Sequence, residues 1–381
     1  MAKLFFIVTV VILATWTADL SGEEQCVVAS VHPLATDAGT DAYLSGGNAV
    51  DAAIATALTL GVVDTPNSGI GGGCFILIRD PLGSITAIDG RETAPLAATA
   101  DMYVRDGKAD PELSTLGPLA IATPGALAAY DLAIKSFGKT KLADLLRPAA
   151  EIAENGFAID RIYAQKLADK SEQLRQFPGS ASILLKPDGS TYAAGERLRQ
   201  VDLARSYRAI ANSGIDWFYR GPFADQVSAW MRDNGGILTA DDFDRYLPAL
   251  RQPVITDYRQ WKIIGFPPPS SGGVHVAQML NLLETYDLGS EFERDPTRAT
   301  HLVIEAMKLA FADRAHWLGD ADFAKVPMGL IDKEYAKSLA KRIDVEKSSD
   351  VESYGNPLPF DHNSFNRHTT HIAAADTEGY W

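Results

Sequence analysis

Hydrophobic and polar positions along the chain predict helices first. Residues 35–44 and 49–62 have helical patterns, and the breaker at 45–47 separates them with two glycines that suit a helix end needing positive φ. Asn48 stands where an N-cap belongs, and Asp51 follows three residues later, near the positive end of the helix dipole. Because residues 49–62 are rich in Ala, Leu and Val, we predict that this second helix is buried.

A hairpin is predicted next. The apolar runs 74–78 and 85–88 flank a Pro/Gly turn at 81–84, a pattern typical of two short buried strands. A glycine-rich stretch at 67–73 precedes the hairpin, and residues 89–92 follow it. We therefore expect Asp-Gly-Arg-Glu at the end of the second strand.

The rest of the chain is mainly helical by the same criteria. The predicted elements are helices over 124–154 with a break at Gly138, helices joined by polar loops up to Tyr246, a strand pair over 255–264, and helices over 274–286 and 297–318. In the last helix, Leu302, Ala306, Leu309 and Ala310 share one face. Residues 345–368 are polar and aperiodic, as in a linker.

Composition narrows the class of protein. A net charge of −14 over 381 residues argues against nucleic acid or anionic membranes as partners. With 46% hydrophobic residues, the chain can bury a large core. Cys26 and Cys74 are too few for a disulfide framework, although a single bridge between them stays open.

The first residues predict export. Lys3 precedes an apolar run at 4–14 that is too short to span a bilayer comfortably, and polar residues follow. We interpret residues 1–25 as a secretory signal peptide, with an uncleaved anchor as the alternative. The mature protein would then be secreted or periplasmic.

The polar linker runs into Thr369-Thr370 and then into a short apolar run. A cut before Thr369 would give this threonine a free α-amine, whose pKa of about 8 leaves a useful fraction neutral. That amine could take the proton of the hydroxyl, so one residue would supply nucleophile and base. The simpler alternative is a pair of strand or capping threonines.

Several ordered blocks carry a resemblance to a known family. They are Gly46–Ala53, Gly71–Phe75, Ile88–Pro95, Thr123–Gly125, Pro267–Gly273, Ala312–Arg314 and Thr369–His371. Together they resemble the γ-glutamyltranspeptidase family, also called glutathione hydrolases, over nearly the whole chain after residue 26.

The resemblance implies an α+β fold, the αββα sandwich of N-terminal-nucleophile hydrolases. It implies that Thr369 attacks the carbonyl of His368, so that the precursor splits into a large-subunit region, 26–368, and a small subunit beginning at 369–381. Thr369 would then attack the γ-glutamyl amide of glutathione, and water or an acceptor amino acid or peptide would resolve the ester. The small subunit stays bound, and no cofactor or metal is implied.

Arg91 is the second implied site residue, because it matches the family arginine that holds the α-carboxylate of the γ-glutamyl group. A guanidinium suits this role, since its planar fork binds a carboxylate through two hydrogen bonds. Without the resemblance, Arg91 would pair with a nearby acid such as Glu92.

Other candidate features have plainer interpretations. Residues 69–73 lack the Gly-Lys-Ser/Thr of a phosphate loop and precede a strand, so we expect tight backbone packing there. Ser270 or Ser271 is expected to cap the following helix. His362, His368 and His371 match no usual zinc spacing, so no metal site is predicted.

The chain also departs from the family. From Thr369 onward it has 13 residues, and Ala373 and Tyr380 replace residues that are usual there. We therefore expect an incomplete sandwich that is inactive alone, because oxyanion-hole donors would be lacking. Two alternatives stay open, a truncated binding or regulatory homologue without catalysis and a cephalosporin or glutaryl amide acylase of the same family.

Overall fold

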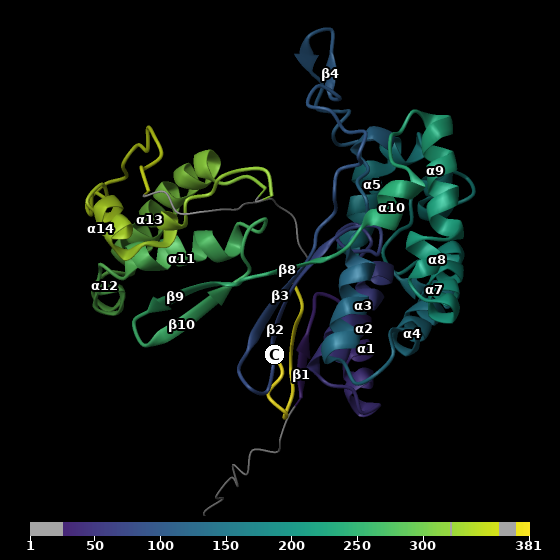
Figure 1. Ribbon diagram of the computed structural model, residues 1–381, viewed down its shortest axis with the longest axis horizontal. Coiled ribbons are helices and arrows are strands. Elements are labelled where there is room, and N and C mark those ends of the chain that lie inside the picture. The colour runs from purple at the N-terminus through teal and green to yellow at the C-terminus, as the bar shows by residue number, and fades with distance from the viewer. Residues whose placement is uncertain (1–25, 321, 358–370) are drawn as a thin grey trace, which may run out of the picture.

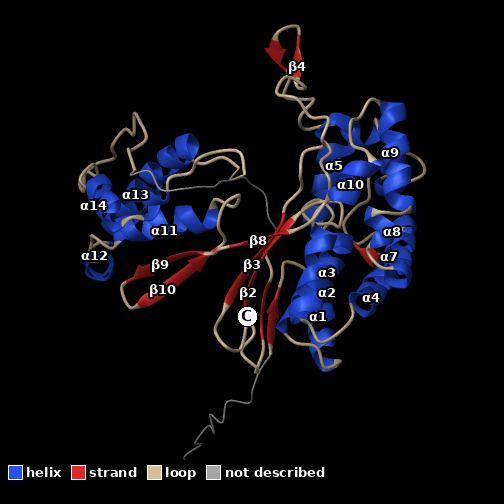
Figure 2. Cartoon of the chain, viewed as in Figure 1, coloured by secondary structure: helices blue, strands red, loops and turns tan. Residues whose placement is uncertain are grey.

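The computed structural model describes residues 26–320, 322–357 and 371–381. Four layers follow one another across the molecule (Figures 1 and 2). Helices α1–α4 form the first layer, and the short strands at the centre of the view form the second. The hairpin of β9 (Val254–Tyr258) and β10 (Trp261–Gly265) forms the third layer, and the helices from α11 (Gly272–Leu283) to α14 (Lys333–Ala340) form the fourth, which gives the predicted αββα order.

The first layer is built around a buried helix. Helix α1 (Pro33–Leu44) and helix α2 (Ala49–Val63) are separated by a turn in which Gly46 has a φ of 88°, as the sequence predicted. Every residue of α2 except Ala53 is buried. Helices α3 (Ala126–Phe137) and α4 (Leu142–Asn155) complete this layer, with the predicted break at Gly138 between them.

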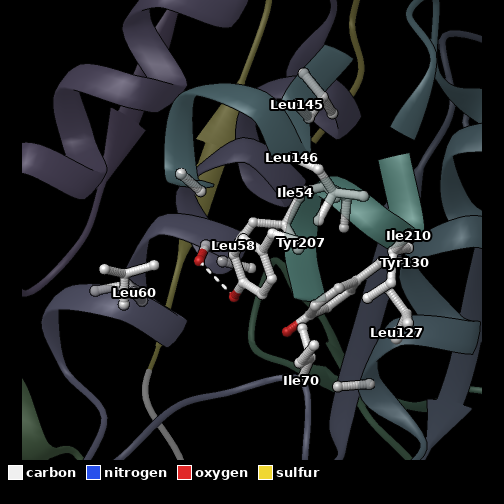
Figure 3. Packing of buried hydrophobic residues seen from close by; sticks show 14 of the residues in the cluster. Ile54, Leu58, Leu60, Ile70, Leu127, Tyr130, Leu145, Leu146, Tyr207 and Ile210 are labelled. Atoms are coloured by element: carbon white, nitrogen blue, oxygen red, sulfur yellow. Dashed lines mark hydrogen bonds between the residues drawn. The ribbon is translucent and has the colours of Figure 1, made fainter. Parts of the chain in front are cut away.

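Large apolar side chains from distant helices pack on α2 (Figure 3). Leu58 and Ile54 contact the cluster that includes Tyr130 and Leu146, all of them buried. Tyr207 is completely buried, and its hydroxyl donates a 3.0 Å hydrogen bond to the carbonyl of Leu58. This bond satisfies the phenol where water cannot reach it.

The strand layer contains the predicted hairpin. Strand β2 (Cys74–Arg79) pairs antiparallel with β3 (Ile85–Gly90), and β8 (Ala249–Arg251) pairs with the other edge of β3. Strand β1 (Val27–Ala29) pairs antiparallel with β11 (Ala373–Ala375), the segment nearest the C-terminus. Helix α2 packs on β1 and β11, and α3 packs on β2 and β3, so one helix layer covers both pairs.

The region between α4 and β8 is mainly helical, as predicted, with short strand pairs at its edge. Its elements are β6 (Phe157–Ala158), α5 (Arg161–Arg175), α6 (Pro178–Leu184), β7 (Arg197–Leu198), α7 (Val201–Ser213), α8 (Asp216–Tyr219), α9 (Pro222–Asn234) and α10 (Ala240–Arg245). The connection between β3 and α3 contains β4 (Val104–Arg105), β5 (Lys108–Ala109) and η1 (Pro118–Ala120).

The far side of the molecule has its own hydrophobic cluster. Its elements are β9 (Val254–Tyr258), β10 (Trp261–Gly265), α11 (Gly272–Leu283), α12 (Leu288–Arg294), α13 (Pro296–Trp317), η2 (Met328–Ile331) and α14 (Lys333–Ala340). The strand pair and the two long helices are confirmed, and the four residues predicted to share a face of α13 are buried. Helix α11 begins two residues earlier than predicted, at the glycine pair, and it ends three residues earlier than predicted.

Two further expectations can be compared with the described residues. Cys26 and Cys74 are both free, so the single bridge that the sequence left open is absent. Residues 345–357 form no helix or strand, in agreement with a linker. Among the described residues, no helix combines the length and apolarity that crossing a membrane requires. The predicted signal peptide, residues 1–25, lies outside the described residues.

A pH effect on stability is expected from His32, the N-cap of α1. Its Nδ1 accepts a 3.2 Å hydrogen bond from the backbone N–H of Leu34, which requires an unprotonated nitrogen. Burial lowers the pKa of His32 below its ordinary 6.5, and the carboxylates of Asp160 and Asp64 only partly oppose this. The unfolded chain therefore binds more protons near and just below pH 6.5, so the free energy of unfolding falls as pH falls through that window.

The measurement is urea unfolding at pH 5.5 and 7.5 for the wild type and for His32→Asn, which keeps a capping oxygen but does not titrate. We expect the wild type to lose more stability on acidification than the variant. Equal losses in the two proteins would contradict the assignment.

Candidate active site at the start of the C-terminal strand

The backbone of Arg91 is held from both sides at the end of β3. Its N–H donates a 3.0 Å hydrogen bond to the Oδ1 atom of Asp89, and its carbonyl accepts a 2.7 Å hydrogen bond from the hydroxyl of Tyr246. Asp89 is buried, and Tyr246 comes from the loop after α10. As a whole residue, Arg91 is half-buried. These contacts fix where the guanidinium starts, which is what a residue binding a substrate carboxylate requires.

Glu92 packs against the glycine-rich loop. A Cβ atom added to Gly73 would lie 2.7 Å from its Oε2 atom and equally close to the carbonyl of Gly90, so only glycine fits. The carbonyl of Gly72 accepts 3.0 Å hydrogen bonds from the N–H groups of Gly125 and Ala126 at the start of α3. The loop therefore joins β2 to α3 by backbone contacts.

The packing prediction for this loop is correct only in part. It holds at Gly73, whereas a Cβ atom added to Gly69 or Gly71 would meet nothing within 4 Å. Gly125, in the Thr-Pro-Gly block, is crowded in the same way as Gly73. A Cβ atom there would lie 2.0 Å from the hydroxyl of Tyr246.

A cavity of about 1030 Å³ lies between β11 and β2. Residues of α2 line it, together with Gly72, Glu92, Ser270 and the segment from His371 to Ala375. Trp381 exchanges two backbone hydrogen bonds with Arg79, the last residue of β2. The segment therefore begins, at His371, toward the opposite end of β2, where Glu92 and the glycine loop lie.

Of the site residues predicted from the sequence, only Arg91 lies within the described residues. Arg91 precedes Glu92, which lines the cavity, but Arg91 is not itself among the lining residues. His368 and Thr369 lie outside the described residues, as does His362. Among residues 26–320, 322–357 and 371–381, no group of three or more His, Cys, Asp or Glu side chains could hold a metal ion.

Three further side chains clarify the local chemistry. Ser271 occupies the N-cap position of α11 without a side-chain bond, and the capping contact comes from Ser270, whose Oγ accepts a 3.2 Å hydrogen bond from Gly272.

Burial, then the nearby Glu92 and Asp89, raise the pKa of the Cys74 thiol well above its usual range. The thiol is therefore protonated at neutral pH and is a poor nucleophile.

An ion-pair network that sequence reasoning missed supports Asp89. Arg251 of β8 donates from Nε to Asp89 at 3.0 Å and binds Asp322 with both terminal nitrogens at 2.8 Å. Asp322 lies between α13 and η2, within the stretch of chain that forms the second hydrophobic cluster. Nothing in the sequence distinguishes Arg251 from an ordinary strand arginine, because its partners are 162 and 71 residues away.

Comparison with known proteins agrees with this architecture. The gamma-glutamyltranspeptidase family model matches residues 35–381. The glutathione hydrolase proenzyme of Escherichia coli (strain K12) is 40% identical over 362 residues, covering 93% of this chain and 61% of that protein. The acylase ACY 1 proenzyme of Pseudomonas sp. (strain SE83) is 40% identical over 369 residues, covering 94% of this chain and 64% of that protein. The crystal structure of Helicobacter pylori gamma-glutamyltranspeptidase matches with a TM-score of 0.81 at 39% identity, covering 84% of this chain and 92% of that chain.

The layered structure and this solved relative define an N-terminal-nucleophile hydrolase fold, as predicted. Within that class, the chain belongs to the gamma-glutamyltranspeptidase family. It spans less than two thirds of the length of the two curated relatives.

Substitutions in the ion-pair network should have unequal costs. The side chain of Asp89 is 6% exposed and that of Asp322 is 57% exposed. Arg251→Met leaves Asp89 buried without its cation and should lower the free energy of unfolding by about 3 kcal/mol. Asp322→Asn removes a solvent-exposed partner and should cost less than about 1 kcal/mol.

Urea unfolding measures both changes, and the double variant Asp89→Asn with Arg251→Met should recover part of the loss because no unpaired charge is left. Equal costs for Arg251→Met and Asp322→Asn would contradict the burial argument.

Proposed function

We propose that the protein carrying this chain is a precursor that cuts itself between His368 and Thr369 and then acts as a γ-glutamyl transferase and glutathione hydrolase. The supporting observation is the cavity that brings the segment starting at His371, two residues after Thr369, to the same place as Glu92 and the glycine loop beside Arg91. Family membership supplies the chemical class.

In the proposed cut, the Thr369 hydroxyl attacks the carbonyl carbon of His368, and the peptide nitrogen leaves with a proton as the new α-amine. Water then hydrolyses the ester that joins the two pieces. In the proposed turnover, the α-amine takes the hydroxyl proton while Thr369 attacks the γ-glutamyl amide, and the proton passes to the departing amine, cysteinylglycine for glutathione. Water or an acceptor amine then releases the γ-glutamyl group.

Arg91 is proposed to bind the α-carboxylate of the γ-glutamyl group. A guanidinium forms charge-assisted hydrogen bonds to a carboxylate, and its planar fork fixes the carboxylate's orientation. The Asp89 and Tyr246 contacts to its backbone support this role, because they hold the residue in one place.

The organisation of the precursor follows from the same proposal. Residues 1–25 would be a signal peptide that sends the protein to the periplasm or outside the cell. Residues 26–368 would form the large-subunit region, and residues 369–381 would begin a small subunit that stays bound to it. Activity is proposed for the whole protein and not for this chain alone.

A second candidate is an amide acylase that acts on cephalosporin or glutaryl side chains. The observation that favours it is the 40% identity to the acylase ACY 1 proenzyme, as high as that to the Escherichia coli glutathione hydrolase proenzyme. Comparing hydrolysis of glutathione and of a glutaryl amide by the same preparation distinguishes the two candidates. A glutaryl amide, like a γ-glutamyl amide, carries one free carboxylate that Arg91 could bind. The presence of Arg91 therefore does not distinguish the two substrates.

Thr369→Ala should abolish the cut, because alanine has no hydroxyl that could attack the carbonyl of His368. On a denaturing gel, the wild-type precursor should give two bands and the variant one band. Thr370→Ala is the matched control and should still be cut. A cut that persists in Thr369→Ala would show that the nucleophile is assigned wrongly, and an uncut wild type would favour the alternative of a non-catalytic binding or regulatory homologue.

Arg91→Met should lower kcat/KM for a γ-glutamyl anilide by roughly 10- to 100-fold, chiefly through KM, because one charge-assisted pair is lost. The cut itself should persist, as a gel would show. Arg105→Met, which removes an exposed guanidinium in β4, is the control and should leave kcat/KM unchanged. An unchanged KM in Arg91→Met would sink the assigned role.

A further inference from the structure

The N-terminus of α2 is capped completely by side chains. The first N–H groups of a helix have no partner within it. Here Asp51 Oδ2 accepts from Asn48 at 2.8 Å, and Asn48 Oδ1 accepts from Val50 and Asp51 at 3.0 and 3.2 Å. The remaining group, the N–H of Ala49, donates a 2.8 Å hydrogen bond to Oδ2 of Asp376, 327 residues away. One acceptor of this buried helix end therefore comes from the far end of the chain.

Asp376 uses its other oxygen to hold its own turn together. Oδ1 accepts 3.0 Å hydrogen bonds from the N–H groups of Glu378 and Tyr380. The backbone N–H of Asp376 donates to the carbonyl of Tyr380 at 3.1 Å. The carboxylate therefore joins a closed turn to α2, and its negative charge lies at the favourable end of the helix dipole.

Other contacts fix the strand immediately before Asp376. Strand β11 pairs with β1 in a single register, in which Val27 faces Ala375. The hydroxyl of Tyr43 donates to the carbonyl of Ala375 at 2.9 Å and also lies within hydrogen-bond reach of the carbonyl of Val27. With only three residue pairs, this ladder is too short to set its register firmly without help.

We propose that Asp376 is a positioning residue for Thr369. It fixes β11 lengthwise against the N-terminus of α2, and so fixes where the chain that leads back to Thr369 begins. A slip of one residue would turn every side chain of β11 to the opposite face. This inference rests on the proposed function, because it takes Thr369 as the nucleophile.

The proposed cut gives this contact a second role. Ala49 lies before the cut and Asp376 after it, so the bond becomes a contact between two separate pieces. Neighbouring contacts of the same segment are weaker candidates for this role. The ion pair of Lys139 and Glu378 is exposed, and such pairs contribute little.

The structural half of the inference can be tested without any cut, in the gene product carrying Thr369→Ala. Site-resolved amide hydrogen exchange should show Ala49 losing roughly tenfold in protection when Asp376→Ala is added, the usual size of a lost cap. Protection of Leu58, in the middle of α2, should stay unchanged, which shows that the variant is folded. Glu378→Ala is the matched control and should leave Ala49 unchanged. Unchanged protection of Ala49 in Asp376→Ala would overturn the inference.

The functional half uses the full-length protein with Thr369 intact. Asp376→Ala should slow the cut, and its cut fraction should have a kcat roughly tenfold or more below wild type at similar KM, because misplacement of a nucleophile affects the chemical step more than binding. Asp376→Asn keeps one acceptor oxygen, so its kcat should lie between those of the wild type and Asp376→Ala. The kcat of Glu378→Ala should match that of the wild type. Wild-type kcat in Asp376→Ala would overturn the positioning role. A cut that persists in Thr369→Ala would overturn the proposed function itself, whatever the exchange of Ala49 shows.

Discussion

The buried N-terminus of helix α2 is the constraint on which the first half of the structure depends. Nearly every residue of this helix is buried, so water cannot satisfy the N–H groups at its start, and each needs an acceptor from the protein. Asn48 and Asp51 provide this locally. Asp51 also accepts from the backbone of Lys139 and Thr140, which ties the α3–α4 connection to the same point. A single helix end thus organises three parts of the chain.

A comparable arrangement lies at the end of β3. Asp89 accepts from the backbone of Arg91 and is held by Arg251, which in turn binds Asp322 beside the second hydrophobic cluster. Burial raises the pKa of Asp89, while the bonds from Arg91 and Arg251 oppose this. The carboxylate is therefore tolerated inside the protein only because both partners are present. The position of Arg91 depends in this way on residues from the far side of the molecule.

Local sequence signals were sufficient for much of this. The caps of α2, the positive φ of Gly46 and the β2–β3 hairpin follow from residues within a few positions of one another, and all three are confirmed. The acceptor for Ala49 and the partners of Arg251 could not be predicted, because they lie far away in sequence and are common residue types. The glycine loop shows the same limit, since only the fold reveals that Gly73 is crowded and Gly71 is not. Of the candidate site, the described residues include Arg91, while Thr369 stays a prediction.

The contacts of residues 371–381 decide whether a cut chain could stay assembled. Their partners include Val27–Ala29, Tyr43, Ala49, Arg79 and Lys139, all of which precede the proposed cut. A three-residue strand pair alone is marginal in water. The carboxylate of Asp376 at the helix end, the paired backbone of Trp381 and Arg79, and the Arg79 guanidinium, which lies 5.8 Å from the indole of Trp381, add directional contacts at separate points. Because these contacts need no covalent link between the two pieces, breaking the chain at residue 368 would free an amine without requiring the strand to move.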